Sequence, residues 1–144
     1  MTKELLAGGC LCGAVRFELT GAPEWAHSCH CSRCRKATGA AFASNLFLPA
    51  GALRFSQGEE RIRSFRPPDA ERFTRAFCEV CGSSLPWSNE ARGRVVVPMG
   101  TLDDDPGCSP QAHIFVGSKA PWFTITDSLP QHPEALGSGK RREP

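Results

Sequence analysis

The sequence lacks the long apolar run that a membrane-spanning helix needs, because no stretch of about 18 apolar residues occurs in it. It also lacks internal repeats, linker-like segments and any helical periodicity longer than two turns. The segment before Cys10 is similar to a lipoprotein cleavage site, but Glu4 interrupts it and the hydrophobic core of a signal peptide is missing. These absences predict one cytoplasmic domain that neither crosses a membrane nor is secreted.

Eight cysteines are the most informative residues of the chain. In a reducing compartment, closely spaced cysteines indicate metal binding before disulfides, so a secreted disulfide scaffold is the weaker interpretation. Three of them, Cys29, Cys31 and Cys34, lie within six positions. A segment this short cannot place three sulfurs in separate core sites. It can curl so that all three bind one zinc ion, which holds thiolates at about 2.3 Å in tetrahedral geometry.

This triplet has no evident fourth ligand, which is typical of a reactive zinc with an open position. The alternative is a second structural zinc, completed by Cys108, His30 or His27. Neighbouring residues of an extended chain point in opposite directions, which argues against His30 between two ligands. Cys108 lies alone in an acidic loop and is equally well explained as a small packed hydrophobe. His27 stays open as a ligand.

Two cysteine pairs remain, and each is bounded by glycine. Cys10 and Cys12 form a Cys-x-Cys pair, and Cys78 and Cys81 form a Cys-x-x-Cys pair followed by Gly82. Glycine lets the backbone turn tightly around an ion. Neither pair can close a tetrahedron alone, so together they predict a four-cysteine structural zinc site that joins distant segments. Such a site can supply about 10–16 kcal/mol of apparent binding free energy, more than the net stability of a typical domain.

The charge of the chain argues against a general role in nucleic-acid binding. The formal net charge is +2 at pH 7, and seven thiolates bound to two zinc ions would bring it to about −1. A basic tail and the arginines at 61, 63 and 66 still allow a zinc-stabilised interaction module without catalysis. A methionine sulfoxide reductase is a third class. It needs a free redox cysteine, and the acidic surroundings of Cys108 would raise its thiol pKa.

Alternating apolar and polar residues predict a mainly β domain of short strands. Strands are expected at residues 15–20, 41–48, 53–55, 61–66, 72–77, 95–97, 113–116 and 122–126. One or two helical turns are expected at residues 35–38, ending at Gly39. We expect one folded domain over residues 5–133 and a polar, disordered tail over residues 134–144.

Three segments carry a specific pattern of seven cysteines, namely Gly9–Val15, Cys29–Gly39 and Phe77–Ser83. Weaker matches lie at Gly100–Asp104, His113–Phe115 and Lys119–Trp122. Over about residues 5–133 the sequence resembles the glutathione-dependent formaldehyde-activating enzymes, a family that includes centromere protein V-like proteins. The resemblance implies an arrangement of coiled antiparallel β-sheets with short helical turns, the fold named for mammalian suppressor of Sec four.

The resemblance also implies two zinc ions. The structural site would consist of Cys10, Cys12, Cys78 and Cys81, and the catalytic site of Cys29, Cys31 and Cys34. The implied activity is that of a carbon–sulfur lyase or synthase, in which the thiol of glutathione adds to formaldehyde and gives S-(hydroxymethyl)glutathione. The expected partners are therefore a small-molecule thiol and an aldehyde.

The residues around the triplet fit this chemistry. A zinc ion with an open position can hold a thiol as its thiolate or polarise an aldehyde oxygen. Because three thiolates already donate charge, the ion is a weak Lewis acid, and we favour the first role. Arg33, Arg35 and Lys36 could bind a substrate carboxylate, although solvated surface charges explain them equally well. His113 and Trp122 could reach the site, but core roles explain them more simply.

Overall fold

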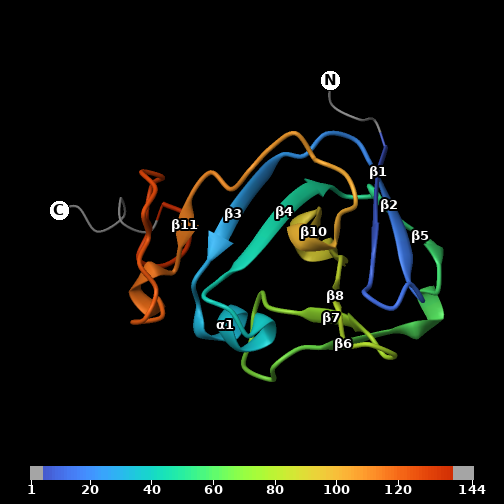
Figure 1. Ribbon diagram of the computed structural model, residues 1–144, viewed down its shortest axis with the longest axis horizontal. Coiled ribbons are helices and arrows are strands. Elements are labelled where there is room, and N and C mark those ends of the chain that lie inside the picture. The colour runs from blue at the N-terminus through green and yellow to red at the C-terminus, as the bar shows by residue number, and fades with distance from the viewer. Residues whose placement is uncertain (1–4, 138–144) are drawn as a thin grey trace.

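The structure, a computed structural model, describes residues 5–137, and three small β-sheets account for most of its regular secondary structure (Figure 1). The first sheet is antiparallel and has the order β1-β2-β5, formed by β1 (Leu5–Gly9), β2 (Arg16–Thr20) and β5 (Leu53–Gln57). Phe17 and Leu19 alternate along β2 and are buried together with Leu6. The turn between β1 and β2 carries the first cysteine pair.

The second sheet has five strands in the order β11-β3-β4-β10-β9. Its strands are β3 (Trp25–Cys29), β4 (Ala43–Pro49), β9 (Trp87–Asn89), β10 (Arg94–Pro98) and β11 (His113–Ile114). All neighbours are antiparallel except β11 and β3, which are parallel. One face of the sheet packs on the first sheet and forms the core through Ala26, Leu46, Leu48, Val95 and Val97. Because side chains alternate along a strand, the other face is free to line a site.

The third sheet and the one α-helix of residues 5–137 lie below the second sheet in the view of Figure 1. The third sheet consists of β6 (Ile62–Phe65), β7 (Arg75–Cys78) and β8 (Ser84–Leu85). Helix α1 (Ser32–Thr38) follows β3 almost directly and ends at Gly39, whose left-handed φ of 67° lets its N–H donate to the Arg35 carbonyl. Short 3₁₀ turns are η1 (Glu59–Arg61), η2 (Glu90–Arg92), η3 (Met99–Thr101) and η4 (Val116–Ser118).

The mainly β fold predicted from the sequence is confirmed, and so is the helix that ends at Gly39. The predicted strands correspond to β2, β4, β5, β6, β7, β10 and β11, with shifted ends. The strand predicted at residues 122–126 is wrong, because this segment pairs with no other strand. Its start is part of a turn in which the Phe123 N–H donates to the Ala120 carbonyl at 3.2 Å. The strands β1, β3, β8 and β9 were not predicted.

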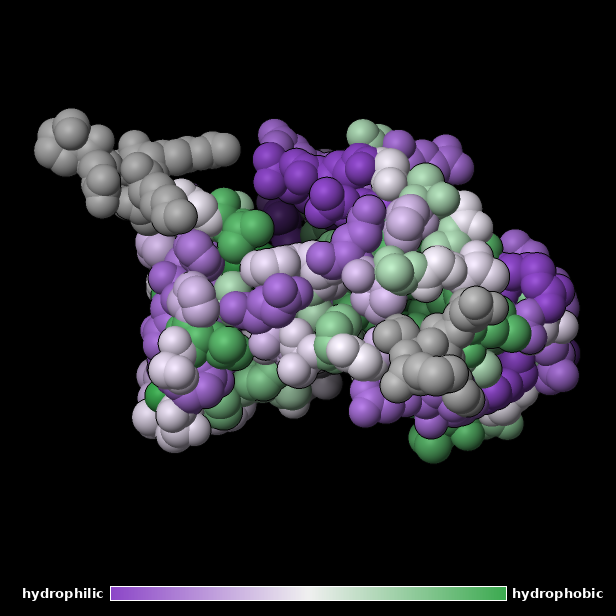
Figure 2. All heavy atoms as spheres, turned by 90° about the horizontal axis from the view of Figure 1, so that it is seen from above, coloured by the Kyte–Doolittle hydropathy of each residue, from purple (hydrophilic) through white to green (hydrophobic). Residues whose placement is uncertain are grey.

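The last described residues pack on the fold. The Phe115 N–H donates to the Glu134 carbonyl at 2.8 Å, and the Gly137 N–H donates to His132 Nδ1 at 3.2 Å. The rest of the predicted disordered tail, residues 138–144, lies outside the described residues. No helix within residues 5–137 is long and apolar enough to cross a bilayer. On the face shown in Figure 2, hydrophobic residues lie in small separate areas between hydrophilic ones.

Candidate functional site

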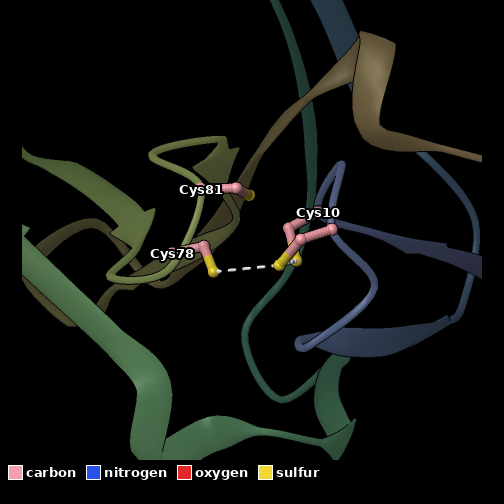
Figure 3. A group of neighbouring side chains, drawn as sticks. Cys10, Cys78 and Cys81 are labelled. Atoms are coloured by element: carbon pink, nitrogen blue, oxygen red, sulfur yellow. Dashed lines mark hydrogen bonds between the residues drawn. The ribbon is translucent and has the colours of Figure 1, made fainter.

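Two tight turns from different sheets bring four thiols together. Cys10 begins the turn after β1, in which the Gly13 N–H donates to the Cys10 carbonyl at 3.2 Å. Cys78 ends β7, and the Gly82 N–H donates to its carbonyl at 2.8 Å, with Gly82 at a left-handed φ of 78°. The sulfurs of Cys10, Cys12, Cys78 and Cys81 all lie within 4.8 Å of one another. Figure 3 shows Cys10, Cys78 and Cys81 converging from the two turns.

The spacing of these sulfurs fits a zinc ion. The Cys10 and Cys12 sulfurs are 3.6 Å apart, and those of Cys12 and Cys78 are 3.8 Å apart. Four thiolates at the usual zinc–sulfur distance would form a tetrahedron with edges of about 3.8 Å. Backbone N–H groups also point at sulfur, from Val15 to Cys10 at 3.2 Å and from Val80 to Cys78 at 3.4 Å. Such donors stabilise thiolates, the form that binds a metal.

Ser83 joins the two turns of this four-cysteine group. Its hydroxyl oxygen accepts a hydrogen bond from the Leu11 N–H at 2.9 Å and lies 3.2 Å from the Cys81 sulfur. The hydrogen bond from the Ser83 hydroxyl is the main reason that the pKa of Cys81 is lowered to about 5. The first and third sheets are therefore linked here by polar contacts as well as by the four thiols.

The second group of thiols lies where β3 runs into α1. Cys29 is the last residue of β3, Cys31 is the N-cap of α1, and Cys34 lies in the first turn of the helix. Their sulfurs also lie within 4.8 Å of one another. The Cys34 N–H donates to the Cys31 sulfur at 3.3 Å, so a helix N-cap interaction shapes the group. Cys29 and Cys34 are buried and Cys31 is half-buried, which leaves Cys31 as the most accessible of the three.

The three thiols compete for negative charge. Hydrogen bonds from Cys29 and Cys34 lower the pKa of Cys31 to about 2, and the same interaction raises the pKa of Cys29 to about 12. The pKa of Cys34 is also raised, first by Cys29 and then by Cys31. Three adjacent thiolates are thus not stable without a positive charge between them. A divalent cation would supply that charge, so the donor set and its electrostatics fit a metal.

None of the three residues considered as a fourth ligand joins the triplet. Within residues 5–137, no other His, Cys, Asp or Glu atom completes a group with these sulfurs. His27 Nδ1 instead accepts a hydrogen bond from the Trp25 indole N–H at 3.2 Å. Cys108 packs against the main core, and burial, followed by the charge of Asp105, raises its thiol pKa. His30 is fully buried and bonds to another histidine.

That histidine contact is part of a chain that the sequence did not reveal. His30 Nε2 lies 2.8 Å from His113 Nδ1, and His113 Nε2 lies 3.0 Å from an oxygen of Asp127. The hydrogen bond with His113 is the main reason that the pKa of the Asp127 carboxyl is lowered. Phe42 and Phe123 pack beside the His30 ring, with centroids 5.0 and 6.0 Å away. Asp127 follows the segment wrongly predicted as a strand, and no sequence signal marked it as a partner of His113.

A cavity of about 1200 Å³ opens beside the triplet, and all three of its cysteines line it. One wall is the face of the second sheet that points away from the core. It includes Trp25, His27, Asn45, Phe47, Arg94 and Val96. The facing wall comes from residues 69–76 and β8. The triplet is therefore open to a large cavity, whereas no cysteine of the four-cysteine group lines it.

The residues predicted to lie near the triplet differ in whether they line the cavity. Arg33 lines the cavity and forms an ion pair with Asp69 at 3.1 Å. Arg35 and Lys36 lie in the last turn of α1 and do not line the cavity. His113 is buried and contacts His30, Trp122 is 69% exposed, and neither residue lines the cavity. Of these residues, only Arg33 can contact a ligand in the cavity.

Comparisons with known proteins agree with this description. The family model described as glutathione-dependent formaldehyde-activating enzyme matches residues 5–118. A curated protein of Halomonas elongata, provisionally named as such an enzyme, is 34% identical over 132 residues, which is 84% of this chain and 81% of that protein. A crystal structure of a Rhodobacter sphaeroides protein is similar with a TM-score of 0.53 at 25% identity, covering 72% of this chain and 97% of that one. The chain belongs to the glutathione-dependent formaldehyde-activating enzyme family.

Proposed function

We propose that this protein is a zinc-dependent carbon–sulfur lyase or synthase that forms and cleaves S-(hydroxymethyl)glutathione from glutathione and formaldehyde. The observation that carries the proposal is the contrast between its two thiol groups. Four cysteines form a group that could surround a metal ion completely, whereas Cys29, Cys31 and Cys34 form a group of three thiols that lines a large cavity. Membership of the glutathione-dependent formaldehyde-activating enzyme family supports glutathione and formaldehyde as the two substrates.

The reaction needs a thiolate close to a carbonyl carbon. A sulfur–carbon bond forms while the carbon–oxygen double bond of formaldehyde becomes a single bond, and the proton lost by the thiol ends on the new hydroxyl oxygen. In the reverse direction the same bonds break and form in the opposite order. A zinc ion bound by the triplet would supply a position that stabilises a thiolate at neutral pH.

The residues of the chain orient and protect this site. The Cys34 N–H holds the Cys31 sulfur in place. The burial of Cys29 and Cys34 keeps bulk water from two of the three ligands, so a substrate approaches from the cavity on the side of Cys31. The aromatic side chains of Phe73 and Phe115, which pack against the triplet, make this side apolar.

We assign the four-cysteine group to a structural zinc, because its four ligands leave no open position. It would hold the turn after β1 against the end of β7. We also place the protein in the cytoplasm, since seven cysteines gathered in two metal-binding groups suit a reducing compartment.

Replacement of one triplet cysteine tests the proposal. The wild-type protein should bind two zinc ions and accelerate formaldehyde consumption in the presence of glutathione. Cys31→Ala should keep its fold, lose one zinc ion and lose the acceleration. If the wild-type protein does not accelerate the reaction at millimolar substrate concentrations, the proposed activity is wrong. If Cys31→Ala unfolds, the second zinc is structural and the non-catalytic interaction module becomes the better interpretation.

A further inference from the structure

The cavity beside the triplet has a strongly positive lining. Its arginines are Arg33, Arg72, Arg75, Arg92 and Arg94, and its acidic residues are Asp69 and Glu71. Of the five arginines, Arg33 has a carboxylate partner, Asp69 at 3.1 Å. Within residues 5–137 the other four form no ion pair. Four guanidinium groups that have no carboxylate partner among the described residues indicate that the ligand of this cavity is anionic.

Arg94 is held in a defined position within this lining. Its guanidinium carbon lies 5.7 Å from the centre of the Phe47 ring, close enough for a cation–π contact. The same ring packs against the His27 ring at a centroid distance of 4.9 Å. Phe47 thus supports both polar side chains.

The hydrogen bond from Trp25 fixes how His27 can act. Because His27 Nδ1 accepts the Trp25 indole N–H, the proton of the neutral ring is on Nε2. His27 is therefore a hydrogen-bond donor that lines the cavity near the Arg94 guanidinium. A neutral donor beside a cation is an arrangement that suits a carboxylate, which accepts from both.

The register of the second sheet shows how far the Phe47 ring, which supports Arg94, lies from the triplet along the strands. Phe47, which supports Arg94, is directly opposite Trp25 on β3. Cys29 is four residues further along the same strand, and four residues of a strand span about 13 Å. A ligand with its sulfur at the triplet and a carboxylate at Arg94 must therefore have several bonds between the two groups.

We propose that Arg94, with His27 beside it, forms a carboxylate-binding subsite that selects thiols whose carboxylate is remote from the sulfur. This inference rests on the proposed function, since it assumes a thiol at the triplet. Beyond that function, the inference identifies the residues that bind the end of the thiol remote from its sulfur, and it identifies the group at that end as a carboxylate. Arg72, Arg75 and Arg92 add a positive field that favours anionic thiols over neutral ones.

Calorimetry on the zinc-loaded protein tests the subsite directly. The probes are glutathione, its diethyl ester, which lacks both carboxylates, and 2-mercaptoethanol, a short neutral thiol. Arg94→Gln should weaken glutathione binding roughly ten- to a hundredfold, because a charge-assisted hydrogen-bonded pair is lost. It should leave binding of the diethyl ester and of 2-mercaptoethanol unchanged. Arg94→Lys, which keeps the charge without the two-pronged geometry, should give an intermediate affinity.

Arg54→Gln is the matched control, because Arg54 is an exposed strand arginine that does not line the cavity and pairs with Glu18 instead. It should bind all three probes like the wild type. Equal affinity of wild-type protein and Arg94→Gln for glutathione overturns the subsite, and so does an equal loss for glutathione and its diethyl ester. The proposed function fails separately. If thiols bind but none of them accelerates formaldehyde consumption, the activity is wrong and the binding comparison still decides the subsite.

Discussion

His30 donates a hydrogen bond from Nε2 to Nδ1 of His113 over 2.8 Å, and both rings are buried. Asp127 determines this direction, since its carboxylate can only accept and therefore takes the proton on His113 Nε2. His30 lies between Cys29 and Cys31, and β11 carries His113 alongside β3. The histidine pair thus holds the turn from which two of the three triplet cysteines project.

Loss of His113 should loosen this turn. We expect His113→Phe to lower the free energy of unfolding by about 1–3 kcal/mol, because the buried His30 N–H loses its acceptor. It should also speed the release of zinc from the triplet, measured with a chromogenic chelator. Asp127→Asn, which keeps an acceptor at an exposed position, should have a smaller effect on both quantities. Equal effects of the two variants would contradict the role given to the histidine pair.

The stability of the fold should decrease in mild acid. Burial, with a further contribution from His113, lowers the pKa of His30 to about 4, whereas a histidine in an unfolded chain titrates near 6.5. Between these values the unfolded chain binds the extra proton, so stability falls as the pH drops from about 6.5 to about 4. Urea unfolding at a series of pH values should show this slope, and it should be shallower in His30→Asn. An unchanged slope in this variant would show that His30 does not contribute.

Replacement of a cysteine in the four-cysteine group should have a much larger effect than replacement of Cys108, which belongs to neither thiol group. Cys81→Ser should lose one zinc ion and most of its folded signal in circular dichroism, because the four-cysteine group joins two sheets and a structural zinc contributes about 10–16 kcal/mol. Cys108→Ser is the matched control, since its thiol packs against the core outside both groups. It should keep both zinc ions and its activity. A soluble Cys81→Ser protein with two zinc ions and cooperative unfolding would refute the assignment of this group.

Gly58 should tolerate no side chain. It has a φ of 76°, and a Cβ atom there would lie 1.9 Å from the Ala14 carbonyl oxygen. Gly51 also has a left-handed φ, of 86°, but nothing lies within 4 Å of its Cβ position. Gly51→Ala should therefore show only the conformational cost, about 1 kcal/mol, and Gly58→Ala should lose clearly more. Thermal unfolding of the two variants measures the difference, and equal midpoints would contradict the close approach at Gly58.

Much of the fold could be predicted because apolar residues recur at alternate positions along a strand that has one buried face. The valines of β10 and the alternation around Phe17 show it clearly, and these segments are strands. The sequence did not predict β3, because one face of this strand lines the cavity with Trp25 and His27. Its residues are therefore only partly apolar. The sequence did not predict β1 either, because this strand ends in two glycines. Gly8 is needed there, since a Cβ atom would lie 2.5 Å from the Phe17 ring.

The thiol groups could be predicted because metal chemistry requires ligands at close spacing. Segments as far apart as Cys12 and Cys78 can then be paired by counting ligands alone, and their sulfurs lie 3.8 Å apart. No such rule connects His113 with Asp127 or Phe47 with Arg94. These contacts depend on how strands pair and on where an irregular segment packs. The cavity lining was therefore visible only in three dimensions.

Strand β7 connects the four-cysteine group with the wall of the cavity. Its four residues begin with Arg75, which faces the cavity, and end with Cys78, a member of the closed thiol group that is fully buried. A metal ion bound at Cys78 would therefore hold one end of a strand whose other end, about 10 Å away, forms part of the cavity wall. If each thiol group binds a zinc ion, the two ions would share no ligand, yet zinc at the four-cysteine group would steady the wall of the cavity on which the triplet opens. Zinc at one end of β7 would then act as a remote regulator of recognition at the other.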